Sequence, residues 1–268
     1  MPEVSVVMPA RDEAASIAQS IASVQAQTLA DWELIVVDDG SSDGTADVVE
    51  RLGDRRVRVL RLPASGVPVA ANAGLAAATA PFVARQDADD LSLPERLERQ
   101  VAFLRSRPDV AVVGSRWIEV GPDGSRQRPR TRFVEGRLDA HLPRFNPITH
   151  STATFRRDVV AALGGYDVTL PYAADYDLWL RLAHGGSTLW NLPDELAVRT
   201  MSGMNMSARG ERAQIREELR IRWRDAARRR RDGLPARRQV GFLAARLPML
   251  FVPIPLKRAV RRRQGKAP

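Results

Sequence analysis

Residues 82–94 read Phe-Val-Ala-Arg-Gln-Asp-Ala-Asp-Asp-Leu-Ser-Leu-Pro, a short apolar run followed by three carboxylates. The run has the composition of a buried strand, and Asp87, Asp89 and Asp90 follow where that strand would open into a loop. An Asp-x-Asp pattern can hold a hard divalent cation through oxygen and leave other coordination positions to water and phosphate oxygens. This stretch therefore predicts a site that binds a nucleotide diphosphate through a metal ion.

An alternative interpretation is that the acidic loop only caps the helix that follows it. Ser92 and Glu95 match the Ser-x-x-Glu capping box. Apolar residues then recur at helical spacing at Leu97, Val101 and Leu104. We expect the helix to use Ser92 and Glu95, and Asp90 to serve the loop and the helix start, which leaves Asp87 and Asp89 for binding.

The first 115 residues alternate apolar runs with amphipathic stretches. The runs predict strands at Val4–Met8, Leu34–Val37, Val57–Leu62 and Phe82–Arg85. Because helical stretches join them, we expect an α/β fold with a mostly parallel, Rossmann-like central sheet flanked by helices. Ligands of such sheets bind beyond the carboxyl ends of the strands. Asp38 and Asp39 follow the second predicted strand, just as Asp87 and Asp89 follow the fourth.

Residues 110–208 show a looser pattern. Apolar runs predict strands at Val110–Gly114 and Thr152–Phe155. Helical spacing predicts helices at Glu135–Leu142, Asp158–Leu163 and Asp175–His184. A loop from Pro193 to Ser207 would lead into a long basic helix, Glu211–Arg231.

The composition limits both the compartment and the partners. Cysteine is absent, so any metal would be held by oxygen or histidine nitrogen. The N-terminal residues contain no basic, apolar leader, and we expect a cytoplasmic protein. Of the 41 basic and 32 acidic residues, 19 and 5 lie in residues 209–268, so the tail carries +14 and residues 1–208 carry −5. Such a tail is expected to contact a polyanionic surface, and the lack of a nucleic-acid-binding motif favours anionic lipid over nucleic acid.

The last part of the tail, Val240–Leu256, is apolar but contains Pro248, Pro253 and Pro255. It is shorter than the ~20 apolar residues that a membrane-spanning helix needs. Two interpretations of residues 209–268 remain open. The region is either a basic helical extension that lies at the membrane interface or a helix pair that packs its apolar side on the body.

Five motifs follow one another along the chain. They are Val-Ser-Val-Val-Met-Pro-Ala-Arg-Asp-Glu at 4–13, Trp-Glu-Leu-Ile-Val-Val-Asp-Asp-Gly-Ser-Ser-Asp-Gly-Thr at 32–45, Ala-Asn-Ala-Gly-Leu at 71–75, Asp-Ala-Asp-Asp at 87–90, and Gly-Gly-Tyr at 164–166 with Ala-Ala-Asp-Tyr-Asp-Leu-Trp at 173–179. In this order and spacing they resemble glycosyltransferase family 2, which has the GT-A fold. The resemblance covers about residues 3–208. It implies a GT-A domain at 1–208, with a nucleotide-sugar-binding half at 1–115 and an acceptor half at 116–208, and a basic helical tail at 209–268.

The resemblance also implies how a nucleotide-sugar donor is bound. Pro9, Arg11 and Glu13 would line the base and the ribose, and Asp39 would hydrogen-bond the base. For its neighbour Asp38, a role in the turn or in capping the next helix is equally open.

Further motif residues would contact the rest of the donor. Gly66 and Asn72 would lie near the ribose or the sugar, and Asp87 and Ala88 would bind near the ribose and sugar hydroxyls. Asp89 would be the direct ligand of Mg²⁺ or Mn²⁺, both of which prefer oxygen, and the cation would neutralise charge on the departing diphosphate.

Asp175 matches the position of the family's catalytic base. It opens a predicted helix whose dipole and free N–H groups favour an ionised carboxylate, although a role as the helix N-cap is the alternative. Ala174 stands where relatives carry Glu. His150 and Arg199 are secondary candidates, His150 near the acceptor or the phosphates and Arg199 over the diphosphate, and Met201 stands near where relatives carry a metal-reaching His.

Together these features predict an inverting, metal-dependent glycosyltransferase. It would move a sugar from a nucleotide diphosphate sugar, a UDP-sugar being favoured, to a hydroxyl of a glycan or lipid-linked saccharide in polysaccharide or cell-envelope biosynthesis. The tail would keep it peripheral on the cytoplasmic face of the membrane. Two alternatives remain open: a catalytically silent nucleotide-sugar-binding scaffold, and a nucleic-acid-associated protein that uses the basic tail.

Overall fold

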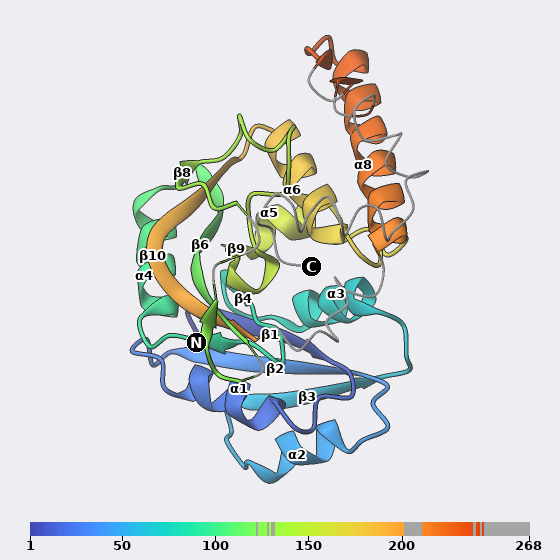
Figure 1. The fold of residues 1–268 in the computed structure, drawn as a ribbon. Coiled ribbons are helices and arrows are strands. Elements are labelled where there is room, and N and C mark those ends of the chain that lie inside the picture. The colour runs from blue at the N-terminus through green and yellow to red at the C-terminus, as the bar shows by residue number, and fades with distance from the viewer. Residues whose placement is uncertain are drawn as a thin grey trace.

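A single mixed sheet runs through the protein, with helices on both of its faces (Figure 1). The computed structural model describes residues 1–121, 123–127, 129, 132–200, 211–237, 240, 241 and 243. Within them the strand order is β3-β2-β1-β4-β9-β6-β10-β5, with β7 paired to β6 and β8 paired to β10. The predicted α/β fold, with a mostly parallel central sheet and flanking helices, is confirmed.

The N-terminal half consists of parallel strands joined by helices. The strands are β1 (Val4–Ala10), β2 (Trp32–Asp39), β3 (Val57–Leu62) and β4 (Phe82–Arg85). The connecting helices are α1 (Ile17–Gln25), α2 (Thr45–Arg51) and α3 (Val67–Ala77). All residues of β1 are buried because both faces of the strand are covered. Val6 and Met8 pack in the cluster that includes α1, whereas Val7 packs in the cluster that includes α3.

The elements after β4 complete the sheet, and one of their helices, α6, carries the base candidate. The strands are β5 (Leu91–Ser92), β6 (Val110–Val120), β7 (Arg126–Gln127), β8 (Gly136–Arg137), β9 (Thr154–Arg156) and β10 (Thr188–Thr200). The helices are α4 (Arg96–Ser106), the short 3-10 helix η1 (His150–Thr152), α5 (Arg157–Ala162), α6 (Ala174–His184) and α8 (Glu211–Arg231). β6 and β10 pair in parallel, and β9 joins them to β4 in the opposite direction.

Two predicted segments of the second half are wrong. Residues 135–142 form no helix, because β8 pairs with β10 and turns follow it as far as residue 144. In place of the expected loop from Pro193, β10 continues to Thr200. Register shifts between Leu192 and Glu195 let the strand accommodate Pro193, because a proline has no N–H to donate to the neighbouring strand.

The predicted capping box is also wrong. Helix α4 begins at Arg96 and has no side-chain cap, while Ser92 belongs to β5. The hydroxyl of Ser92 donates to Oε1 of Gln86 and accepts from Nη1 of Arg96. Ser92 therefore supports the acidic loop rather than the helix.

Helix α8 packs on the body along α6, as Figure 1 shows. Its buried apolar residues are Ile215, Leu219, Ile221 and Ala226. One side of this helix thus packs on the body, whereas the segment Val240–Leu256, on which the two interpretations of the tail depend, lies largely outside the described residues. Among the helices that the structure describes, none combines the length and the apolar composition that crossing a bilayer requires.

Helix α3 lies against β1 at a glycine. A methyl group on Gly74 would lie 2.3 Å from Cγ1 of Val7 and 3.2 Å from Cγ2 of Val37. We expect Gly74→Ala to lower the free energy of unfolding by about 1–2 kcal/mol, because overpacking outweighs the gain in helix propensity. Urea unfolding followed by circular dichroism measures this change.

The matched control is Gly185→Ala at the end of α6. There a methyl group would come no closer than 3.5 Å to the nearest atom, so stability should change little. Equal effects of the two substitutions would contradict the close approach of α3 to β1.

Candidate active site

Three carboxylates meet where β4 ends. Oxygen atoms of Asp87, Asp89 and Asp90 all lie within 4.8 Å of one another. We call these residues the acidic cluster. β4 lies between β1 and β9, so the cluster is at the carboxyl end of a central strand. The carboxylates thus lie together beyond the end of a strand, where the sequence predicted them.

The loop that carries the acidic cluster is held from behind by buried polar side chains. Gln86, which is fully buried, donates through Nε2 to the carbonyl of Asp90 at 2.7 Å. Its Oε1 accepts from Nη1 of Arg96 at 2.7 Å, and Nη2 of Arg96 donates to the carbonyl of Arg85 at 2.6 Å. Arg96 is only 1% exposed. This network fixes the backbone from the end of β4 to the start of β5.

Each carboxylate of the cluster has a different environment. Burial tends to raise the pKa of Asp87, but the positive charge of Arg85, 2.9 Å away, contributes most to a net lowering. Burial raises the pKa of Asp89 to about 7, with further contributions from the carboxylates of Asp90, Asp87 and Glu13. A divalent cation bound here would displace the proton of Asp89 and would offset both the cost of burying its charge and the repulsion among the carboxylates.

Asp90 belongs to the cluster, although the sequence assigned it to the helix start. Its Oδ2 accepts from the hydroxyl of Ser151 at 2.6 Å, and its Oδ1 accepts from the backbone N–H of Thr200 at 3.2 Å. Burial raises its pKa to about 6, and the negative charge of Asp87 adds to the shift. The run of acidic residues in Asp-Ala-Asp-Asp was the available signal for this role, but the apparent capping box masked it.

Arg199, near the end of β10, lies beside the cluster. Its Nε is 3.6 Å from Oδ2 of Asp90, and its Nη1 is 3.8 Å from Oε1 of the buried Glu119. The structure therefore brings this secondary candidate to the acidic cluster. Met201 lies outside the described residues.

Asp39 and Gly66 meet at the ends of β2 and β3. The carboxylate of Asp39 accepts from the backbone N–H of Ser65 at 2.7 Å and from that of Gly66 at 2.9 Å. Gly66 has a φ of 95°, which a residue with a side chain rarely adopts. Asp38 accepts from the N–H of Ser41 at 3.2 Å, which is the turn role expected as its alternative.

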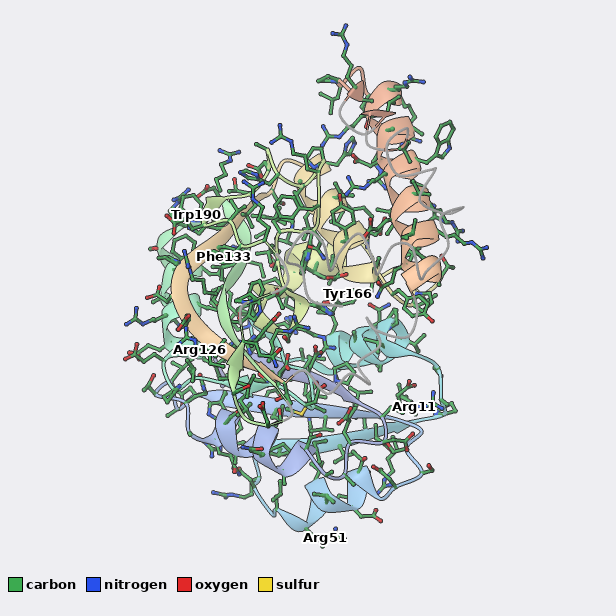
Figure 2. All side chains as sticks on the ribbon, viewed as in Figure 1. Arg11, Arg51, Arg126, Phe133, Tyr166 and Trp190 are labelled. Atoms are coloured by element: carbon green, nitrogen blue, oxygen red, sulfur yellow. The ribbon has the colours of Figure 1, made fainter. Side chains whose placement is uncertain are left out.

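The other base-binding candidates lie in β1, which pairs with β2, or in the loop that follows it. Pro9 is buried in β1, and the next residue, Ala10, pairs with Asp38 of β2. Arg11 is exposed at the surface, as Figure 2 shows. The backbone N–H of Glu13 donates to Oγ1 of Thr45 at 2.8 Å, which joins the two loops that follow β1 and β2.

Asn72 and Ala88, which were predicted to contact the nucleotide-sugar donor, also contact other parts of the protein. Nδ2 of Asn72 donates to the carbonyl of Tyr166 at 2.9 Å, and its Oδ1 accepts from the N–H of Tyr166 at 2.8 Å. Asn72 thus ties α3 to the turn before α6. Ala88 is 4% exposed and packs in the core cluster with α1 and α4, so only its backbone is available to a ligand.

Asp175 lies in the first turn of α6, one residue after the helix begins at Ala174, and Ala173 is the N-cap. Its Oδ2 accepts from Nδ2 of Asn146 at 2.7 Å. Burial raises its pKa to about 6, and the negative charge of Asp87 adds to the shift. Backbone N–H groups at the helix start lower this pKa, as expected, but burial outweighs them.

His150 packs behind the cluster. Its Nε2 forms a hydrogen bond of 2.9 Å with the hydroxyl of Tyr166, and its ring meets those of Tyr166 and Trp179 edge-on. Burial and the nearby Arg85 lower the pKa of His150 to about 3, which keeps the ring neutral. Asp177 is buried and pairs with Arg181 at 2.7 Å, which agrees with the supporting role expected of it.

Known proteins share both the sequence and the fold. The sequence model of Glycosyl transferase family 2 matches residues 5–164. The amylovoran biosynthesis glycosyltransferase AmsE of Erwinia amylovora is 33% identical over 204 residues, which cover 75% of this chain and 76% of that protein.

Solved structures with low sequence identity have the same architecture. S. aureus TarS 1–349, in complex with UDP-GlcNAc, has a TM-score of 0.72 at 20% identity and covers 92% of this chain and 72% of its own. The mannosyltransferase PcManGT from Pyrobaculum calidifontis, in complex with GDP-Man and Mn²⁺, has a TM-score of 0.67 at 22% identity over 98% of this chain and 80% of its own. The chain therefore belongs to glycosyl transferase family 2, and it is a glycosyltransferase with the GT-A fold.

Proposed function

We propose that this glycosyltransferase moves a sugar from a nucleotide diphosphate sugar, a UDP-sugar being favoured, to a hydroxyl of a glycan or a lipid-linked saccharide. The transfer inverts the anomeric carbon and uses a divalent metal ion. The observation that carries the proposal is the acidic cluster at the end of β4, which is close enough to Asp175 for Asp87 to interact with it electrostatically. A cation site and a candidate base therefore lie close together. Three similar proteins support this chemistry: AmsE is named a glycosyltransferase, TarS is in complex with UDP-GlcNAc, and PcManGT is in complex with GDP-Man and Mn²⁺.

The donor would lie across the ends of β1, β2 and β4. Pro9, Arg11 and Glu13 would line the base and the ribose, and Asp39 would reach the base from the loop that it holds. In this proposal residues 1–115 form the donor half and residues 116–208 the acceptor half, and Asp175 on α6 belongs to the latter.

The acidic cluster fits Mg²⁺ or Mn²⁺. Asp89 is the proposed direct ligand, with Asp87 and Asp90 beside it. When bound, the cation would stabilise the negative charge that develops on the departing diphosphate. Arg199 lies next to Asp90 and adds positive charge at the same place.

Asp175 is the proposed base. It would take the proton of the acceptor hydroxyl while the oxygen attacks the anomeric carbon from the face opposite the diphosphate. With a pKa of about 6, the carboxyl is mostly ionised at neutral pH and accepts a proton more readily than an ordinary aspartate. Asn146 orients it through the hydrogen bond to Oδ2.

The basic tail would hold the enzyme on an anionic membrane surface, on the cytoplasmic face, where a lipid-linked acceptor is within reach. Support comes from the side of α8 that faces away from the body. Arg216 and Arg220 are exposed there, and Trp223 is 66% exposed. Arginine and tryptophan together suit the headgroup region of a bilayer, since the former attracts anionic lipid and the latter prefers the interface.

Asp89→Asn is expected to lower metal-dependent release of nucleoside diphosphate by about 100-fold or more, because the neutral amide oxygen holds the cation far less tightly than the carboxylate. The assay incubates a panel of nucleotide sugars with Mn²⁺ or Mg²⁺. Asp109→Asn, at the opposite end of β6, is the control and should behave like the wild type.

The same assay separates transfer from the scaffold alternative. Wild-type protein that binds a donor but releases no nucleoside diphosphate with either metal would be a silent scaffold, and the proposal would fail.

Asp175→Asn is expected to lower turnover by about 100-fold or more while donor binding persists, since an amide cannot take the proton. In the wild type, turnover should fall about tenfold per pH unit below pH 6 and level off above it, because only the ionised carboxylate is active. Turnover of the variant at the wild-type rate would disprove the base assignment.

Replacing Arg216 and Arg220 with Gln is expected to weaken binding to vesicles that contain phosphatidylglycerol by about tenfold or more, at about 1 kcal/mol per arginine. Trp223→Ala should also weaken it. Vesicle flotation measures the bound fraction, with phosphatidylcholine vesicles and a short RNA as comparisons.

The charge-matched control replaces Arg51, at the end of α2 (Figure 2), and Arg55, beyond it, both of which are exposed. If both double variants lose binding equally, or if RNA competes with the vesicles at moderate salt, the assigned surface is wrong.

A further inference from the structure

Helix α8 lies beyond residues 5–164, which the family model matches, yet it contacts both segments that hold Asp175. One segment is the N-terminus of α6, which carries Asp175. The other is the stretch 143–146, which ends at Asn146, the hydrogen-bond donor to Asp175.

Glu217 of α8 holds the backbone at the entry to α6, a helix that has no side-chain cap of its own. The N-cap residue of α6 is Ala173, which has no side chain that could cap the helix. Oε2 of Glu217 accepts from the backbone N–H of Tyr172 at 2.9 Å and from that of Ala173 at 3.0 Å. A carboxylate at a helix N-terminus also interacts favourably with the helix dipole. Glu217 thus fixes the backbone two residues before Asp175.

Arg222 of α8 joins the two segments. Its side chain is buried, with 1% of the residue exposed. Nη1 donates to the carbonyl of Pro143, and Nη2 donates to that of Arg144 at 3.0 Å. The guanidinium also lies over the ring of Tyr176, 5.0 Å from its centre, next to Asp175 in the chain. A buried charge needs such partners, so these contacts define one geometry.

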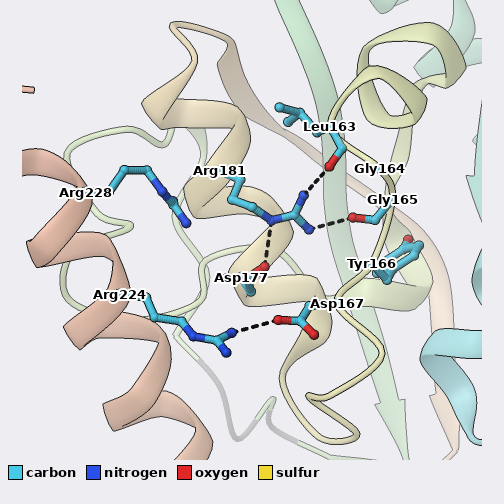
Figure 3. A pocket seen from close by; sticks show the side chains of 9 residues that line it. All are labelled: Leu163, Gly164, Gly165, Tyr166, Asp167, Asp177, Arg181, Arg224 and Arg228. Carbon is cyan, nitrogen blue, oxygen red and sulfur yellow. Dashed lines mark hydrogen bonds and ion pairs between the residues drawn. The ribbon is translucent and has the colours of Figure 1, made fainter.

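A third contact joins α8 to the turn before α6. Arg224 pairs with Asp167 at 2.7 Å, across a pocket of about 460 Å³ between α6 and α8 (Figure 3). On the α6 side of the pocket, Arg181 donates to the carbonyls of Leu163 and Gly165. The turn, α6 and α8 therefore form one charged, hydrogen-bonded unit.

We propose that Glu217 and Arg222 are positioning residues, and that α8 completes the catalytic site by setting the place and orientation of Asp175. This inference rests on the proposed role of Asp175 as the base. A displacement of about 1 Å in a reacting group can cost about 100-fold in rate. Because Asn146 and Asp175 come from different segments, their hydrogen bond persists only if both segments stay in place.

The charged and titratable groups around Asp175 define what a pH profile reports. Asp87 faces it from the end of β4, and Tyr166 interacts with it from the turn before α6. From α8, Glu217 and Arg222 contact the residues on either side of it.

The test compares Glu217→Ala with Glu217→Gln in the full chain. The readouts are kcat for hydrolysis of a UDP-sugar that the donor panel identifies, the pH at which kcat falls on the acid side, and the Kd for UDP with Mn²⁺. Glu217→Ala is expected to lower kcat by about tenfold or more and to leave Kd within about twofold. The fall of kcat on the acid side should begin at a higher pH, because a looser hydrogen bond from Asn146 raises the pKa of Asp175. Glu217→Gln keeps an acceptor oxygen and should restore most of the rate.

Arg222→Lys provides a second, independent variant, because lysine keeps the charge but lacks the planar fork that spans both carbonyls. It should show the same pattern as Glu217→Ala. Arg230→Ala, exposed on the same helix, is the control and should leave all readouts unchanged.

The inference is overturned if Glu217→Ala keeps the wild-type kcat and if its kcat falls on the acid side at the same pH as that of the wild type. It is also overturned if Glu217→Ala loses turnover and donor binding in equal proportion, with no change in the pH of that fall, because that pattern reports general loss of structure. Wild-type turnover by Asp175→Asn would instead remove the base assignment itself. An inactive Asp175→Asn with a normal Glu217→Ala would remove only the role of α8.

Discussion

The acidic cluster can exist because buried cations lie behind it. Arg85 and Arg96 are 2% and 1% exposed, and both donate to backbone carbonyls around the end of β4. Burial lowers the pKa of Arg96 to about 10, while Asp90 and Asp87 oppose that shift, so the guanidinium stays charged. These arginines offset part of the repulsion among the carboxylates and hold the loop in one conformation. A divalent cation would meet a site whose shape is already set.

Much of the donor side could be predicted from sequence because its signals are local. A strand that is buried on both faces must be apolar along its length, so β1, β2 and β4 are recognisable as continuous runs. Parallel pairing then places the residues after each strand on one edge. Asp39, Asp87 and Asp89 lie at that edge as predicted.

The second half was harder to predict because contacts distant in sequence decide it. Pro193 marks a loop locally, yet pairing with β6 carries β10 through it. Ser92 matches a cap locally, yet Gln86 and Arg96 bind its hydroxyl. The raised pKa of Asp175 depends on burial, which no local pattern reveals. Likewise, nothing near residue 217 indicates a contact with residue 173.

The contacts of α8 also have a consequence for how the enzyme is made. Domains fold progressively as a chain leaves the ribosome, N-terminal parts first. A nascent chain that has reached residue 200 already contains every strand that ends at the proposed donor site, but it lacks Glu217 and Arg222. An incomplete translation product would thus bind the activated sugar with Asp175 less precisely placed, and it would hydrolyse that sugar more slowly than the finished enzyme.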